Sequence, residues 1–355
     1  MTARINPRAD VSGLRAVEME NDWLRLTVLP DVGAKIYDLV WKNTRRNFLW
    51  HNPRISPQPY AIEANFDNYW CGGWDEGFPT CDECDHQGEH YPNLGELRAV
   101  RWSVTSAGMV GGNVVAALTA FGPISPVRAR KSVILAGEQP IVSVHYEIEN
   151  LGPLRVEFIW GTHPALDLSQ RMILRIPAKA GIVGLASHPS MGEPGQRYSW
   201  PLLKTPRGTT DMSRTQSMEA GVFCGHYATE LEAGWYAVED ETTGDGFLLT
   251  FPVDLCPYLW MWMVYGGWRG YHHLILEPWT SYPVNLAAAV KQGTARKLET
   301  GERFEVEVAA TIYSKPETWK DALSRVGSYT AEQSKETRPE SEDHRQRAAY
   351  RRSAG

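Results

Sequence analysis

The sequence lacks the features that place a chain in a membrane or outside the cell. No apolar run in its 355 residues approaches the roughly 18 residues that a membrane-spanning helix requires. Its opening residues contain no apolar segment of the type found in secretory signals. The five cysteines are an odd number in a large chain without such a signal, which indicates reduced thiols. We therefore expect a cytoplasmic protein with no membrane contact.

An excess of basic residues is also missing. The chain has 36 Lys and Arg against 42 Asp and Glu, a net charge of −6 at pH 7. Nucleic-acid-binding proteins usually present a basic field to the phosphate backbone, so we expect no nucleic-acid partner. Gly-rich phosphate loops of the Walker or dinucleotide-binding type are absent too. The sequence therefore gives no indication of a nucleotide cofactor.

Helical periodicity is scarce, whereas short strand patterns recur along the chain. Alternating apolar residues, separated by Gly, Pro or Asn turns, mark residues 23–29, 34–41 and 304–308 among many others. This pattern predicts an all-β protein with one large antiparallel β-sandwich. We expect residues 1–15 to form a loosely structured extension and residues 16–330 to form the domain. A short amphipathic helix is expected at 316–326, and the charged residues 331–355 form a disordered tail.

Phenylalanine is rarer than the other aromatic residues. The chain has 9 Phe against 14 Trp and 15 Tyr. Trp and Tyr combine a large apolar face with a polar group, which suits the binding of a sugar ring. Ordinary packing within the sandwich accounts for most of these residues. Trp260 and Trp262 point to the same face of one strand, where either a sugar or a core packs against them.

Two strands end at a titratable residue followed by proline. Leu274, Ile275 and Leu276 form a buried strand that delivers Glu277, and Pro278 follows. A second strand runs into His163 in the same way. A carboxylate at the end of a buried strand is costly without a partner or a purpose. Both residues are therefore candidates for catalysis, the alternative being a paired or capped structural role.

A long stretch with little periodicity, residues 51–97, indicates a functional loop. Trp70 and Trp74 offer stacking surfaces, and Asp75 and Glu76 offer acceptors for sugar hydroxyl groups. The alternative is a glycine-hinged loop whose aromatic residues cover one end of the sandwich. We interpret Trp74, Asp75 and Glu76 as ligand contacts.

The same loop contains four residues of a type that binds zinc. They are Cys81, Cys84, His86 and His90. Their spacing is unusual for a zinc site, and no second Cys pair of this type follows. We expect a polar loop with reduced thiols and keep a metal site as the alternative.

Several of these segments resemble the aldose 1-epimerase, or galactose mutarotase-like, superfamily. The resemblance lies in Pro30, Gly33, Ile36, Asn47 and Leu49, in the motif around Trp160, Gly161, His163, Pro164 and Leu166, and in the Glu277 strand followed by Gly293, Leu298, Gly301 and Glu302. It covers about residues 16–313. Gly95, Arg98 and Trp102 also match a family motif, but Leu94 stands where the family often has a histidine that contacts the ring oxygen.

The resemblance implies a supersandwich fold and a sugar isomerase that interconverts anomers without a cofactor. It makes Glu277 the catalytic base and His163 the acid, with a monosaccharide or sugar derivative as substrate. Arg98 becomes a candidate substrate contact, and His90 or His86 is a candidate replacement for the missing histidine. Two alternatives stay open. Leu94 favours a non-catalytic sugar-binding protein, and the Cys/His loop favours a metal-assisted sugar isomerase, epimerase or lyase.

Overall fold

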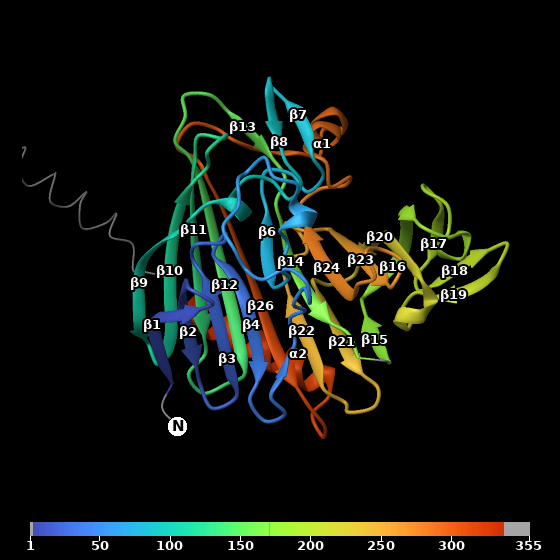
Figure 1. The fold of residues 1–355 in the computed structure, drawn as a ribbon, viewed down its shortest axis with the longest axis horizontal. Coiled ribbons are helices and arrows are strands. Elements are labelled where there is room, and N and C mark those ends of the chain that lie inside the picture. Colours follow the sequence, from blue (N-terminus) through green and yellow to red (C-terminus); the bar gives the residue numbers. More distant parts are fainter. Residues whose placement is uncertain (1–2, 170, 337–355) are drawn as a thin grey trace, which may run out of the picture.

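The computed structural model describes residues 3–169 and 171–336, and antiparallel strands dominate it (Figure 1). Two large sheets pack face to face around one apolar core, which confirms the expected β-sandwich. Within the described ranges, no helix is long and apolar enough to cross a membrane.

The first large sheet has twelve strands. Its spatial order is β1 (Arg4–Val11), β2 (Leu14–Glu20), β3 (Leu24–Leu29), β4 (Lys35–Trp41), β6 (Trp74–Gly77), β14 (Gly161–Asp167), β24 (His272–Trp279), β23 (Tyr258–Tyr265), β20 (Val222–Leu231), β16 (Ala178–Ala186) and β17 (Arg197–Ser199), with β5 (Arg46–Asn47) paired to β4. The strand that carries His163 therefore lies beside the strand that carries Glu277, in the middle of this sheet.

The second large sheet has eight strands. Its order is β15 (Met172–Arg175), β21 (Trp235–Asp240), β22 (Gly246–Thr250), β26 (Arg303–Tyr313), β12 (Ile141–Asn150), β11 (Val127–Leu135), β10 (Asn113–Phe121) and β9 (Ser103–Val110). Three small ribbons complete the strands, namely β7 (Cys84–His86) with β8 (Glu89–Tyr91), β13 (Val156–Phe158) with β25 (Arg296–Leu298), and β18 (Leu202–Thr205) with β19 (Gly208–Asp211). The β18–β19 ribbon projects from the sandwich beyond β16 and β17 (Figure 1).

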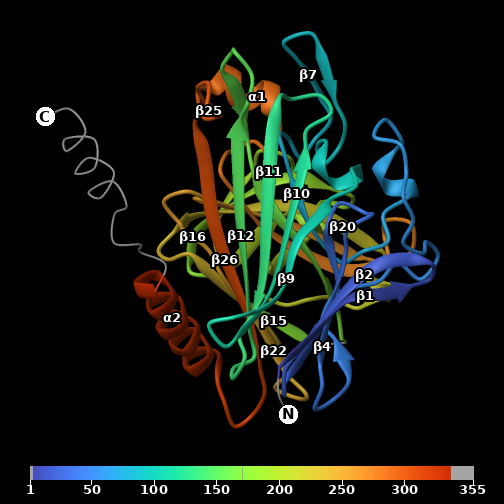
Figure 2. The same ribbon diagram turned by 90° about the vertical axis from the view of Figure 1, so that its left-hand side faces the viewer.

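Helices are few and short. The α-helices are α1 (Leu286–Gln292) and α2 (Trp319–Glu336), and the 3₁₀ turns are η1 (Phe66–Asn68), η2 (Leu97–Ala99), η3 (Pro189–Met191) and η4 (Met218–Ala220). Helix α2 lies on the outside of the sandwich (Figure 2), where Ala322, Val326 and Tyr329 pack against β22 and β26. These positions recur at helical spacing, so one apolar stripe holds the helix.

The alternation of side chains in the twelve-stranded sheet separates the core from the candidate site. In β24, Leu274 and Leu276 point into the core between the sheets, whereas Ile275 and Glu277 point to the opposite face. That opposite face carries a second apolar cluster rich in tryptophan. The candidate site is built on it.

The ends of the domain differ from the expected boundaries. Residues 4–11 form β1, paired to β2, because ladder hydrogen bonds and the Arg4–Glu20 ion pair hold a strand that has little apolar patterning. Helix α2 continues to Glu336, beyond the expected end of the domain at 330, because Tyr329 extends its buried stripe. The rest of the expected tail, residues 337–355, lies outside the described residues. The expected loop 51–97 includes a central strand, β6, which is too short to show periodicity.

Candidate functional site

His163 and Glu277 meet on the outer face of the twelve-stranded sheet. Strands β14 and β24 pair antiparallel, with Gly161 opposite Trp279 and Ala165 opposite Ile275, and this register sets His163 opposite Glu277. The His163 Nε2 atom lies 3.8 Å from Glu277 Oε1. The two residues were expected to face each other across a sugar ring. At this separation the two side chains instead lie side by side, and a sugar ring would contact both from the same side.

Burial controls the protonation of this pair. His163 is 6% exposed and Glu277 is 1% exposed. Burial lowers the pKa of His163 to about 4, so the imidazole is neutral near pH 7. Burial also raises the pKa of Glu277 well above its ordinary value, against a hydrogen bond from Trp279 that favours the carboxylate. Burial therefore favours the neutral form of both residues, in which the proton of the pair lies on Glu277.

Two tryptophans lie flat over glycines of the neighbouring strands. A Cβ atom on Gly161 would lie 2.2 Å from the Trp279 ring, and one on Gly77 would lie 2.3 Å from it. Gly225 stands in the same relation to Trp260, with a separation of 2.2 Å. Any side chain at these three positions would lift the indoles out of their places. The glycines thus allow Trp260 and Trp279 to pack closely against the neighbouring strands beside Glu277.

A cavity of about 220 Å³ stands over the acid–base pair. Trp260, Trp262, Trp268 and Trp70 give it aromatic walls. Its full lining is Phe66, Asp67, Trp70, Cys81, Asp82, Asn93, His163, Leu185, Trp260, Trp262, Trp268, Ile275 and Glu277. Aromatic faces with a few convergent polar groups are typical of a small-molecule site. The expected contacts Trp260 and Trp262 lie in this lining.

Trp74 lies elsewhere than expected. It is fully buried between the two sheets, where its indole N–H donates to Thr162 Oγ1 at 2.6 Å and its ring packs against Phe247. Because β6 alternates, Trp74 and Glu76 face the sandwich core while Asp75 faces the other side. Trp74 is therefore a core residue, and Trp70, four residues earlier, is the loop tryptophan that lines the cavity.

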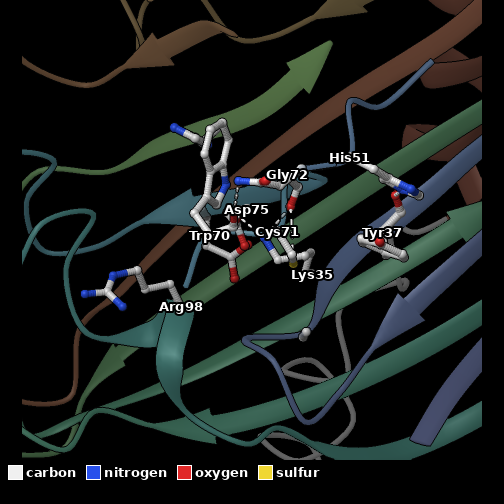
Figure 3. Close-up of polar contacts among 12 residues, drawn as sticks. Lys35, Tyr37, His51, Trp70, Cys71, Gly72, Asp75 and Arg98 are labelled. Atoms are coloured by element: carbon white, nitrogen blue, oxygen red, sulfur yellow. Dashed lines mark hydrogen bonds and ion pairs between the residues drawn. The ribbon is translucent and has the colours of Figure 1, made fainter. Parts of the chain in front are cut away.

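The two acidic residues of β6 are bound by lysines on opposite faces of the sheet. Lys35 forms an ion pair with Asp75 and donates to the carbonyl of Gly72 at 2.6 Å (Figure 3). Lys131 donates to Glu76 at 2.8 Å inside the core. Neither carboxylate lines the cavity, which differs from the expected sugar contacts. Asp75 does lie opposite His163 in the ladder, so its charge favours the imidazolium while that of Lys35 opposes it.

Arg98 and His90 stand at the edge of the site. The Arg98 guanidinium is buried, donates to the Asn93 carbonyl at 2.6 Å and lies over the Phe66 ring at 5.0 Å. In Figure 3 it extends away from the Lys35–Asp75 pair. It supports two lining residues, Phe66 and Asn93, without lining the cavity itself. His90 is exposed on β8, outside this cavity, and pairs with Asp85 at 2.8 Å.

The four Cys and His side chains of the loop do not converge on one point in the described structure. Among residues 3–169 and 171–336, no group of three or more His, Cys, Asp or Glu side chains is arranged to hold a metal ion. Cys81 is buried in the cavity lining, and Cys84 contacts Thr80 instead. His86 lies 3.2 Å from Glu157. The four side chains therefore have different neighbours.

Some residues of the site carry no strong sequence signal. Asp82, Asn93, Cys81 and Phe66 come from irregular segments, so no periodicity marks them as lining residues. Leu94, the residue in place of the family histidine, is 1% exposed and packs in the apolar cluster beneath the site. Trp279 had a usable signal, because a residue two positions after Glu277 on a strand shares its face.

Solved structures of low sequence identity share this architecture. A provisionally named aldose 1-epimerase from Klebsiella pneumoniae has a TM-score of 0.68 at 13% identity, over 87% of this chain and 83% of that one. A galactose mutarotase-like protein from Clostridium acetobutylicum has a TM-score of 0.62 at 13% identity, over 88% and 99%. The Slr1438 protein from Synechocystis sp. PCC 6803 has a TM-score of 0.62 at 19% identity, over 88% and 99%.

No protein-family model and no curated protein sequence matches the chain. The likeness to solved structures therefore concerns the fold alone. On that ground, the protein has the large antiparallel β-sandwich fold of the galactose mutarotase-like proteins.

Proposed function

We propose that the protein is a sugar isomerase of the aldose 1-epimerase type, which interconverts the α and β anomers of an aldose. The observation that carries this proposal is the contact of His163 with Glu277 in the lining of an aromatic cavity, where burial favours the neutral form of both residues. Anomer exchange requires one acid and one base on adjacent oxygens of the same carbon. A pair with one proton supplies both.

The reaction balances without any external reagent. One member of the pair takes the proton from the C1 hydroxyl, the C1–O1 bond becomes a carbonyl and the C1–O5 bond breaks. The other member gives its proton to O5. After rotation about C1–C2, O5 attacks the opposite face of the carbonyl and both protons return. The acid and base exchange roles in each half of the cycle, so the pair must accept the proton on either side.

The burial of the two residues supports one order of proton transfer. Because burial favours the neutral form of both groups, we assign Glu277 as the donor to O5 and neutral His163 as the acceptor of the O1 proton. This is the reverse of the assignment that the family resemblance implied. When the ring closes the roles are exchanged. His163, now protonated, is the acid, and Glu277 is the base.

The test is the rate at which a freshly dissolved anomer reaches equilibrium. Polarimetry or NMR on a panel of aldoses should show acceleration by the protein for at least one sugar, and Glu277→Gln should remove it. Leu94 favours a second candidate, a sugar-binding protein without catalysis, since no histidine occupies that position to assist the ring oxygen. Measurable binding of a sugar, with no acceleration for any sugar, would favour this second candidate.

A further inference from the structure

The sugar-sized cavity opens into a second hollow that is strongly acidic. This hollow, of about 380 Å³, shares Phe66, Asp67, Asp82 and Asn93 with the first. We call it the vestibule. Its lining contains four carboxylates, on Glu63, Asp67, Asp82 and Glu83. Any group that a bound sugar extends toward solvent on this side meets negative charge.

Few cations compensate these carboxylates. In the described part of the chain, neither the cavity nor the vestibule is lined by Lys or Arg. Two guanidinium groups lie nearby. Arg269 is 3.7 Å from Asp67, and Arg98 is held by the carbonyl groups of Asn93 and Ile62. Four carboxylates against two guanidinium groups leave the vestibule with a net negative charge.

The protonation of Asp82 reflects this shortage of cations. The surrounding protein withdraws water from its carboxyl, and Glu83 adds a like charge, so the pKa of Asp82 rises to about 6. Lys35 is bound to Asp75 and lines neither hollow. His90 is bound to Asp85. Asp67 has Arg269 nearby, whereas Asp82 has no ion-pair partner in the described structure, so a positive group of the ligand would meet an unpaired carboxylate there.

Aromatic rings complete a binding site for a cation. Trp262 and Trp268 are half-buried in the cavity wall, with ring centroids 5.8 Å apart and planes at 82°. Ring faces attract ammonium groups, and the attraction increases where carboxylates assist. His163, which is nine-tenths buried, lines the same cavity with its Nδ1 atom lacking a hydrogen-bond partner in the described structure. The cavity therefore has an unsatisfied polar group at its floor and negative charge at its mouth.

We infer that the ligand of this site is an amino sugar, an aldose whose protonated amino group lies beside Asp67 and Asp82, and that sugars with phosphate or carboxylate groups are rejected. The inference rests on the proposed function only in taking the same cavity as the place of the sugar ring. A phosphate or carboxylate in the vestibule would lie among like charges without a cation to bind it.

Binding measurements test the inference separately from catalysis. The probes share one ring: glucose, 2-amino-2-deoxyglucose, 6-amino-6-deoxyglucose, N-acetylglucosamine, glucose 6-phosphate and glucuronate, each titrated by calorimetry or NMR at about pH 7. At least one amino sugar should bind on the order of 5- to 10-fold more tightly than glucose and N-acetylglucosamine. The two anionic sugars should bind more weakly than glucose. Added salt should reduce the preference.

A matched pair of variants locates the effect. Asp82→Asn should reduce the preference for the amino sugar by several-fold with little change for glucose. Asp254→Asn removes one charge from an exposed residue outside both hollows and should leave the preference intact. Equal effects of the two variants would overturn the role of the vestibule.

The outcomes separate the two proposals. An anionic sugar that binds as well as glucose, or amino sugars that bind no better than N-acetylglucosamine, would overturn this inference, whether or not the protein accelerates anomer exchange. The expected order of binding with no acceleration of any sugar would sustain it and sink the isomerase proposal. Absence of binding by every probe would overturn both.

Discussion

The indole N–H of Trp279 donates to Glu277 Oε2 at 2.9 Å. The two residues are two positions apart on β24, so both side chains lie on the same face of the sheet. This bond occupies one carboxyl oxygen, and the other, Oε1, is the atom 3.8 Å from His163. Glu277 is thereby oriented before any sugar arrives, and pre-orientation of this kind is what an acid–base group requires.

Replacement of either member of the pair should abolish most of the activity. Glu277→Gln keeps the shape and removes the titratable group, and we expect a loss of about 10²–10⁴-fold in kcat. His163→Asn should cause a comparable loss. The double variant should be little slower than the single ones, because the two groups act as a unit. Anomer-exchange rates by NMR give the three values, and additive losses would contradict a shared proton.

The rate should follow a bell-shaped dependence on pH. Activity requires one proton on the pair, so it falls as pH drops through the His163 pKa of about 4, when both members are protonated. It also falls as pH rises through the raised pKa of Glu277, when both are deprotonated. Trp279→Phe removes a bond that favours the carboxylate and should move the alkaline limb upward. A profile of kcat/KM against pH checks both limbs, and an unmoved alkaline limb in this variant would count against the assignment.

Glu277 should lower stability at neutral pH. Its folded pKa lies above the ordinary value of 4.5, so its stabilising contribution is complete below pH 4.5 and is lost as pH rises toward the folded pKa. Glu277→Gln should therefore unfold at higher denaturant than the parent at pH 8 and show less advantage at pH 5. The gain grows by at most about 1.4 kcal/mol per pH unit across that interval. A difference that does not change with pH would contradict the raised pKa.

A methyl group against the Trp260 ring should weaken sugar binding. Gly225→Ala places a Cβ atom 2.2 Å from the Trp260 ring and forces the indole to move. We expect KM to rise about 3- to 10-fold, in line with the worth of one aromatic contact, and stability to fall by about 1–3 kcal/mol. Gly108→Ala is the matched control, because nothing lies within 4 Å of a Cβ atom there. Equal KM values for the two variants would contradict a role of Trp260 in sugar binding.

Much of this architecture follows from local pattern. The β-sandwich is predictable because period-two alternation and turn residues recur along the whole chain, and His163 and Glu277 are recognisable because each ends a buried strand next to a proline. The pairing of β14 with β24, which brings the two together, joins segments about a hundred residues apart. Its register is a tertiary property that neither segment reveals alone.

The lining of the cavity was harder to predict. Trp74 and Trp70 lie in one glycine-rich stretch, and only the register of β6 sends the first into the core while the second remains at the cavity. Arg98 and Asp75 have the chemistry of ligand contacts but are held by the chain itself. The sequence shows that such residues are polar and lie in a stretch with little periodicity. It does not show which groups they bind in the folded protein.

The two lysines that bind Asp75 and Glu76 have a consequence for how β6 is positioned. This strand has four residues and sits between β4 and β14. A slip by one residue would reverse its faces, so Glu76 would point toward Lys35 and away from Lys131, and Trp74 would leave the core. The two ion pairs, one on each face of the sheet, therefore fix the register of β6. Since Asp75 lies opposite His163, the register of β6 also decides which residue faces His163 across the ladder.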